Sequence, residues 1–335
     1  MKHFARFLIN ASLLMIFGVT VCAQQTAEFC TREAEPKAAL YKNFLANYKG
    51  SGEQQRLANQ HGNDYISKYG NCPDDSDRQI SAFIQRWLGK YEKAVRRSNL
   101  LSQLAANKVN EAFASAKAVL QDYPDDAGLL YDLARSGITA ALAGNHVNDA
   151  DTLAYARQTI QMLQSNKSFN PDQPLSDAAR NETVGYLYWG IGTLTKQSAP
   201  SEAIDALMNT AKLEGATKRN PLTYAMLADI YEVVYYAPLS DKYKQDCQTE
   251  EQSKAQPCTE LKAKVEAAVD HFVDALARAV AYSNVPENKS GFDQYRPNWM
   301  DSLTTYYKYR HQNSDAGLKE FIEGISAKPM MERMK

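Results

Sequence analysis

The stretch NPLTYAMLADIY, residues 220–231, decides the fold. Apolar side chains recur in it at steps of three and four residues, which is the period of an amphipathic α-helix. The recurring positions are Tyr224, Leu227, Ala228 and Tyr231. Asn220 is a favourable N-cap residue, and Pro221 suits the first helical turn after it. The stretch therefore predicts a helix that starts at Pro221 and buries a face lined by two tyrosines.

Helical periodicity recurs through most of the remaining chain. Further first helices of a pair are predicted at residues 41–48, 84–91, 186–190 and 299–306. Second helices of a pair are predicted at residues 112–124, 203–207, 268–276 and 317–329. Only 16 glycines and 12 prolines are present to interrupt helices in 335 residues, and no stretch has a convincing strand pattern. The chain is therefore predicted to be all-α, with about six helix hairpins.

The repeated pattern resembles the tetratricopeptide repeat. The first helix of that repeat carries an aromatic residue, a large apolar residue, a small residue and a tyrosine, and the second carries alanine, phenylalanine and a closing proline. Residues 224–231 match all four positions of the first helix. The resemblance covers most of residues 36–330 and implies an α-α superhelix with a concave groove. Residues 236–262 depart from the repeat length and are expected to form an insertion.

The first 23 residues have the pattern of an export signal. Lys2 and Arg6 form a basic front, and residues 7–21 are mostly apolar. This run is about 15 residues long, which is shorter than the roughly 20 residues that cross a bilayer as a helix. Ala23 suits a cleavage site, so we expect residues 1–23 to be a signal peptide and no transmembrane segment to remain after its removal.

Cleavage would leave residues 24–335, which we expect to fold as a single helical-repeat domain in the periplasm or outside the cell. Loss of the two basic residues changes the formal charge from −1 to −3, with no basic cluster suited to nucleic acid. The alternative location is the outer membrane, as a lipoprotein anchored through Cys22. It is less favoured because Val21 precedes that cysteine, where lipoprotein signals usually have glycine, alanine or serine.

Four cysteines remain after processing, at Cys30, Cys72, Cys247 and Cys258. An even number in an exported chain indicates disulfides, and of three possible connectivities the local one is favoured, first with second and third with fourth. Cys30 precedes one predicted helix and Cys72 follows the next, so the ends of a hairpin would bring them together. A zinc site is not expected, because no Cys-x-x-Cys pair and no nearby histidine is present.

No residue pattern of an active site is recognisable in the processed chain. Its histidines are far apart and lie outside His-Glu-x-x-His and Gly-x-Ser-x-Gly contexts. They are His61, His146, His271 and His311. The acidic run at Asp74, Asp75 and Asp77 lacks the glycine and glutamate of a calcium loop and predicts a helix start instead. We therefore expect no catalytic residue, no metal, no cofactor and no enzymatic activity.

The tetratricopeptide resemblance also implies which residues face the groove. Residues that lie one to five positions after the leading residue of a first helix, on the adjoining face, are expected to face the groove, and two aromatic residues outside the pattern are added. The candidates are Lys42, Gln85, Tyr131, Arg135, Tyr188, Met226, Asp229, Asp301 and Tyr307. They mix aromatic residues with both charges, as surfaces that recognise proteins or peptides do.

The function expected from the sequence is that of an exported, non-enzymatic scaffold that holds a protein or peptide partner in the cell envelope. A small-ligand or glycan-binding protein is the first alternative, because 20 tyrosines and 3 tryptophans offer rings that stack on sugars. A hydrolase with a site assembled across hairpins is the least favoured alternative. The sequence names neither the partner nor the oligomeric state.

Overall fold

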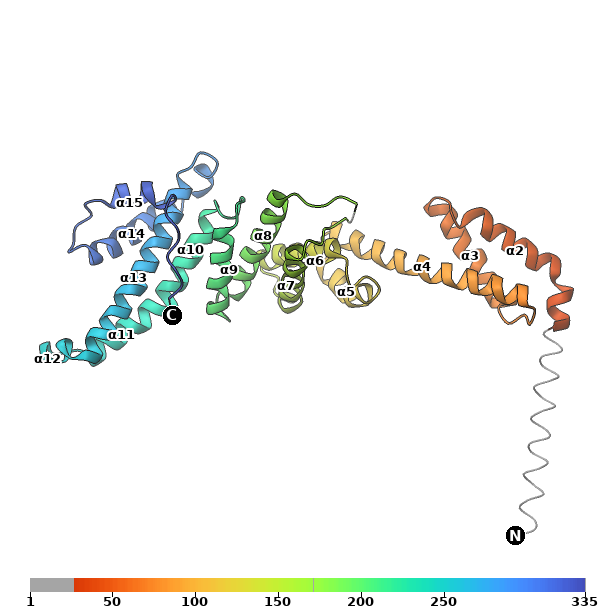
Figure 1. Cartoon of the computed structure of the whole chain (residues 1–335), viewed down its shortest axis with the longest axis horizontal. Helices are drawn as coiled ribbons and strands as arrows, with labels where there is room; N and C mark the ends of the chain where they lie inside the picture. Colours follow the sequence, from red (N-terminus) through yellow and green to blue (C-terminus); the bar gives the residue numbers. More distant parts are fainter. Residues whose placement is uncertain (1–26, 171, 335) are drawn as a thin grey trace, which may run out of the picture. The chain divides into compact units, whose positions relative to one another are not determined.

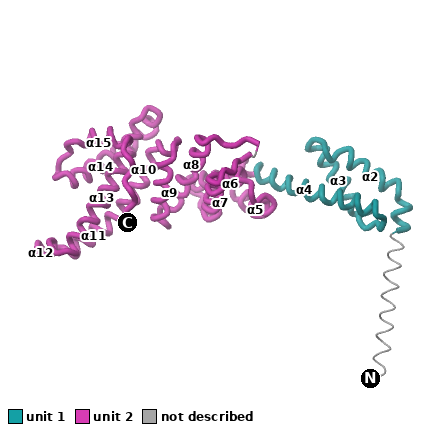
Figure 2. The backbone as a smooth tube through the Cα atoms, viewed as in Figure 1, with its two compact units in different colours: residues 1–102 teal, residues 103–335 magenta. Residues whose placement is uncertain are grey.

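The computed structural model describes residues 27–170 and 172–334, and all their regular elements are helices (Figure 1). No β-strand occurs in these two ranges, so the all-α prediction is confirmed. The predicted signal peptide lies outside the described residues. The chain divides into two compact units, an N-terminal unit of residues 1–102 and a C-terminal unit of residues 103–335 (Figure 2). A single repeat domain over residues 24–335 stays a prediction.

The N-terminal unit packs three helices around an aromatic core. They are α2 (Ala34–Asn47), α3 (Gly52–Tyr69) and the first part of α4 (Asp75–Ala105). Phe44 of α2 is fully buried, and its ring meets Phe83 and Trp87 of α4 edge-on, at centroid distances of 5.8 and 5.2 Å. α4 extends far beyond the predicted stretch 84–91, because no proline interrupts it.

A disulfide and a buried ion pair fasten the segments of the N-terminal unit to one another. The Cα atoms of Cys30 and Cys72 are 5.9 Å apart and the two residues are bonded, which confirms the predicted pairing. Lys37 Nζ donates to Asp77 Oδ2 at 2.6 Å, and the Asp77 side chain is only 5% exposed. The acidic run does begin a helix, as predicted, and its last residue is also buried in the first turn of α4.

The C-terminal unit stacks helices in pairs. Its first helices are α5 (Val109–Asp122), α6 (Ala127–Leu142), α7 (Asp149–Gln164), α8 (Asp177–Thr195), α9 (Pro200–Lys212) and α10 (Pro221–Ile230). The following ones are η1 (Tyr231–Tyr236), α11 (Ala237–Asp246), α12 (Glu250–Lys254), α13 (Gln256–Ser283), η2 (Ser290–Phe292), α14 (Arg296–Arg310) and α15 (Leu318–Ile325). α6 packs against α7, α8 against α9 and α10 against α13, while α14 and α15 both pack against α13. Two of the predicted helix pairs are therefore present, α8 with α9 and α10 with α13, whereas the two helices of the last predicted pair, α14 and α15, each pack on α13.

The stretch that decides the fold forms α10. The side chain of Asn220 accepts a hydrogen bond from the Leu222 N–H at 3.0 Å, which caps the helix, and Pro221 occupies the first helical position. Tyr224 and Tyr231 are both buried. The predicted start of this helix and its predicted buried face are thus confirmed.

α10 continues into α11 through the π-helical turn η1. The Ala237 N–H donates to the Glu232 carbonyl, five residues earlier, and the next residue is Pro238, which has no N–H to donate. Val233 in this turn is 60% exposed. The predicted insertion contains α11, α12 and the second predicted disulfide, whose Cα atoms are 5.8 Å apart. The chain then returns as α13, which packs against α10. Residues 268–276 of α13 are the stretch predicted to pair with α10.

Small residues permit the close approach of paired helices. A Cβ added at Gly137 of α6 would lie 2.9 Å from the Cβ of Thr152 in α7, and Thr152 is completely buried. Because Thr152 is fully enclosed, it cannot move away from an added methyl group without disturbing the packing of α6 on α7.

Gly137→Ala is expected to destabilise the C-terminal unit by about 1–3 kcal/mol, because overpacking outweighs the ~1 kcal/mol by which alanine favours a helix over glycine. Thermal unfolding measures the effect. Gly89→Ala in α4 is the control, since nothing lies within 4 Å of a Cβ added there, and it is expected to be stabilising. An equal gain at both positions would contradict the tight contact between α6 and α7.

Candidate binding site

Four polar or aromatic side chains form a stripe along α13. They follow one another at steps of three and four residues, so they lie on one side of the helix. The α13 stripe consists of His271, Asp274, Arg278 and Tyr282, and all four are buried. Buried polar groups need hydrogen-bond partners. The partners of His271 and Arg278 include the C-terminal end of the described chain.

This end is the strap, residues 326–334, which follows α15 and forms no helix. Arg278 Nη1 donates to the Lys328 carbonyl at 3.0 Å, and Nη2 donates to the Pro329 carbonyl at 2.9 Å. The guanidinium also donates to both carboxylate oxygens of Asp274, at 3.0 and 3.2 Å. The side chains of this ion pair are 4% and 9% exposed. A buried ion pair is favourable only when its remaining hydrogen bonds are also made, and the strap carbonyls accept those of Arg278.

His271 holds the strap at a second point. Its Nε2 lies 2.7 Å from the Glu332 carbonyl oxygen, and its Nδ1 lies 2.8 Å from the Ala267 carbonyl oxygen. A carbonyl oxygen only accepts, so a ring nitrogen that carries a proton donates in these contacts. The ring of Tyr231 packs on the imidazole at a centroid distance of 4.9 Å. α13 thus contacts three main-chain carbonyls of the strap, whatever side chains the strap carries.

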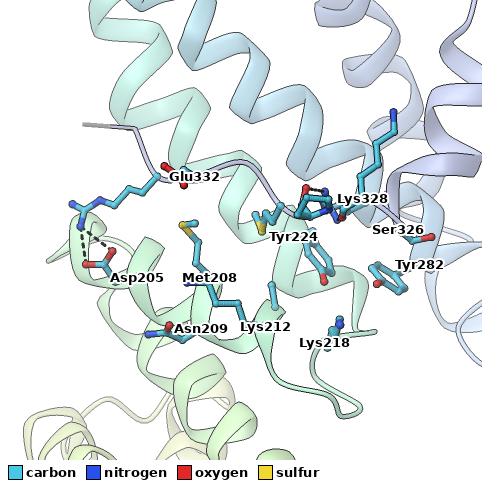
Figure 3. A pocket seen from close by; sticks show the side chains of 15 residues that line it. Asp205, Met208, Asn209, Lys212, Lys218, Tyr224, Tyr282, Ser326, Lys328 and Glu332 are labelled. Carbon is cyan, nitrogen blue, oxygen red and sulfur yellow. Dashed lines mark hydrogen bonds and ion pairs between the residues drawn. The ribbon is translucent and has the colours of Figure 1, made fainter.

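A charged side chain fixes the far end of the strap to α9. Arg333 Nη1 donates to both carboxylate oxygens of Asp205, at 2.8 and 2.7 Å, and its Nη2 donates to the Ser201 hydroxyl. Met330 and Met334 pack against the core of the unit. The strap therefore runs from α13 to α9 (Figure 3). It is attached through its main chain, one arginine and two methionines.

A cavity of about 850 Å³ lies beside the strap, lined by residues of α9, α10 and α13 (Figure 3). Tyr224 and Tyr282 stack in its wall at a centroid distance of 5.1 Å, and their hydroxyls point toward one another. Burial, followed by the neighbouring Tyr282, raises the pKa of Tyr224, so that its hydroxyl keeps its proton and can donate at neutral pH. Lys212 also lines the cavity and forms no ion pair with any described residue, whereas Lys218 is paired with Glu214. The lysine side of the cavity can therefore hold a polar or acidic group.

Four of the predicted groove residues lie along the row formed by α6, α8 and α10. Tyr131 and Arg135 of α6 contact each other, with the guanidinium carbon 6.0 Å from the centre of the tyrosine ring. Met226 of α10 lies 3.6 Å from a threonine hydroxyl of α8, measured from its sulfur. Asp229 of α10 accepts a hydrogen bond from a lysine just after α8, at 2.8 Å. The role of these four residues in binding stays a prediction.

The other five predicted groove residues do not join these four, although one of them, Tyr188, belongs to α8, where it contacts α7. Lys42 and Gln85 are exposed on the N-terminal unit, and Asp301 is exposed on α14. The Tyr188 hydroxyl accepts a hydrogen bond from a glutamine of α7 at 3.3 Å. Tyr307 is buried, and its hydroxyl donates to a backbone carbonyl just before α15, so this side chain packs within the unit.

The α13 stripe and the strap are absent from the candidates chosen from the sequence. The signal that could have revealed the stripe is the placement of His271, Asp274 and Arg278 at helical steps beside the apolar residues of a long helix. The strap replaces the end of a helix predicted over residues 317–329. α15 ends at Ile325. The proline that closes the predicted stretch has no N–H to donate to the carbonyl of Ile325, four residues earlier, and it disfavours helical backbone at Lys328, so the helix does not continue to the end of that stretch.

Metal ligands do not gather in the part of the chain that the structure describes. There, no three side chains of histidine, cysteine, aspartate or glutamate are placed as a metal site would need them. His146 contacts Asp149 at 2.9 Å, and His311 stacks on Tyr307 at 4.0 Å, so each of these histidines has a local partner.

Comparison with known proteins finds no relative of this chain. No protein-family model matches it, and neither a curated protein nor a solved structure does. The tetratricopeptide resemblance therefore rests on the residues of the chain itself, and the structure shows the packed helix pairs that the resemblance implies.

Proposed function

We propose that the protein is an exported, non-enzymatic scaffold of tetratricopeptide type, which binds an extended segment of a partner protein or peptide between α9 and α13. The observation that carries the proposal is the mode of attachment of the strap. Arg278 and His271 contact three main-chain carbonyls of a segment that forms no helix. Main-chain carbonyls are present in every peptide, so the same donors suit an extended segment of another chain.

The two donors are held in place before any segment binds. Arg278 is fixed by its ion pair with Asp274, one turn away on the same helix. His271 is fixed by its contact with the Ala267 carbonyl and by the ring of Tyr231. Side chains that need no rearrangement lose little conformational entropy on binding, which favours affinity for a flexible partner.

The disulfides support the proposed location in the cell envelope. Both favour an oxidising compartment, as an exported protein would meet. None of the helices that the structure describes is long and apolar enough to cross a bilayer.

The proposal is tested by screening a library of labelled decapeptides against the mature chain by fluorescence anisotropy. A peptide that binds is then mapped by hydrogen–deuterium exchange. We expect slower amide exchange over α9 and α13, because the bound segment shields those helices.

Two outcomes would contradict the proposal. A footprint confined to α6, α8 and α10 would move the binding surface to the row that contains Tyr131 and Asp229. Binding of envelope glycans in a parallel thermal-shift screen, with no peptide bound, would replace a peptide partner by a small ligand.

A further inference from the structure

We infer that the strap is a displaceable occupant of the binding site, and that it gives way to a partner segment of the same chemistry. Such a segment is extended and places a basic side chain at Asp205, as the strap does with Arg333. It carries apolar side chains three residues before and one residue after that position, as the strap does with Met330 and Met334. The inference rests on the proposed function, since it names the partner chemistry and the regulation of that same site.

The strap is attached by few apolar contacts. The three residues whose carbonyls are bound, Lys328, Pro329 and Glu332, have exposed side chains. Met331 is exposed as well. Segments that bury little apolar surface open at a low free energy, well below that of global unfolding. The strap can therefore leave while the rest of the C-terminal unit stays folded.

The α13 stripe stays in place when the strap leaves. Arg278 keeps its partner Asp274, and α13 remains packed through apolar residues such as Leu276 and Val280. Two donors of Arg278 and one nitrogen of His271 then lose their carbonyl partners. These donors then face the vacated site, where the main-chain carbonyls of another extended segment can accept the same hydrogen bonds.

A longer segment finds contacts that the strap does not use. A second cavity of about 280 Å³ is lined by residues of α7, α8 and α9, and Asp205 and Asn209 line both cavities. The predicted groove residue Tyr188 also lines the second cavity. A partner that continues past Asp205 gains these contacts, which lets it compete with a tethered strap whose effective concentration is on the order of millimolar.

The test uses the labelled peptide SAKPMMERMK, which has the sequence of residues 326–335, and the full mature chain. Arg333→Glu breaks the ion pair of the strap with Asp205 and weakens the internal competitor. We expect the peptide to bind this variant about tenfold more tightly than it binds the unmodified chain, because a larger fraction of sites is open. Arg56→Glu is the matched control, since Arg56 also donates twice to one carboxylate, that of Glu53 on the N-terminal unit, and it is expected to change nothing.

A charge reversal checks that Asp205 recognises the basic side chain. The Asp205→Lys variant is expected to bind the peptide SAKPMMEEMK, with glutamate in the place of arginine, about tenfold more tightly than it binds SAKPMMERMK. Preference for the arginine peptide in both the unmodified chain and this variant would remove Asp205 from the recognition of the partner. Circular dichroism confirms that each variant is folded.

The possible results distinguish a failure of this inference from a failure of the proposed function. Equal affinity for the unmodified chain and the Arg333→Glu variant would overturn the inference and leave peptide binding, and with it the proposed function, intact. If the peptide binds neither chain, and amide exchange over residues 326–334 is the same in the Arg333→Glu variant as in the unmodified chain, the strap is a fixed part of the fold. That result would also remove the observation on which the proposed function rests.

Discussion

Replacing Arg278 with alanine is expected to lower the free energy of unfolding of the C-terminal unit by about 3–5 kcal/mol. The change leaves the carboxylate of Asp274 buried without its ion-pair partner, and it removes the donors to the carbonyls of Lys328 and Pro329. Urea unfolding followed by circular dichroism measures the loss. The midpoint is expected to fall while the slope with urea stays the same, because the unfolded chain exposes the same surface.

The double variant Asp274→Leu with Arg278→Met is the control for this prediction. It replaces the buried ion pair by apolar side chains of similar size, which is often neutral for stability. We therefore expect most of the lost stability to return, while amide exchange over residues 328–332 stays fast because the donors are still missing. If the double variant is as unstable as the single one, the unpaired carboxylate of Asp274 is not the cause of the lost stability.

Removing the disulfide between Cys30 and Cys72 by two alanine substitutions is expected to cost about 4 kcal/mol in the N-terminal unit. The two cysteines are 42 positions apart in the sequence, so the bond restricts a long loop of the unfolded chain. A unit built on three helices has a small core, and a loss of this size approaches its total stability. Fluorescence of Trp87, in a chain whose other two tryptophans are replaced by phenylalanine, reports the unfolding of this unit alone.

The second disulfide provides the comparison. Cys247 and Cys258 are only 11 positions apart, and on the same chain-entropy argument their loss is expected to cost about 3 kcal/mol, in the C-terminal unit. A larger loss at this short loop than at the long one would contradict the entropic account. An unchanged Trp87 transition in that variant would show that the two units unfold independently.

The sequence predicted the fold well where the determining interactions are local. The cap at Asn220, the apolar period from Tyr224 to Tyr231 and the hairpin that brings Cys30 to Cys72 all depend on residues close together in the chain, or on the ends of neighbouring helices. Such patterns can be recognised without tertiary structure, because a helix repeats every 3.6 residues.

The binding site depends on contacts that no local pattern contains. Arg333 meets Asp205 across 128 positions of sequence, and Arg278 meets Pro329 across 51. The proline at position 329 fits the closing residue of a repeat, and only the packing of α15 on α13 shows that it belongs to the strap. Tyr307 is likewise buried by a later helix, because its ring packs on Phe321 of α15. The sequence around Tyr307 alone does not indicate this burial.

The π-helical turn η1 has a consequence for the ancestry of this chain. Such a turn spans five residues per hydrogen bond instead of four, and one added residue rotates everything after it by about 100° around the helix axis. The faces of α10 and α11 are therefore out of step by one residue across Tyr231–Tyr236. A single inserted codon produces such a rotation without lengthening any loop. An alignment to a regular repeat would need its gap inside a helix here, where gaps are normally least tolerated.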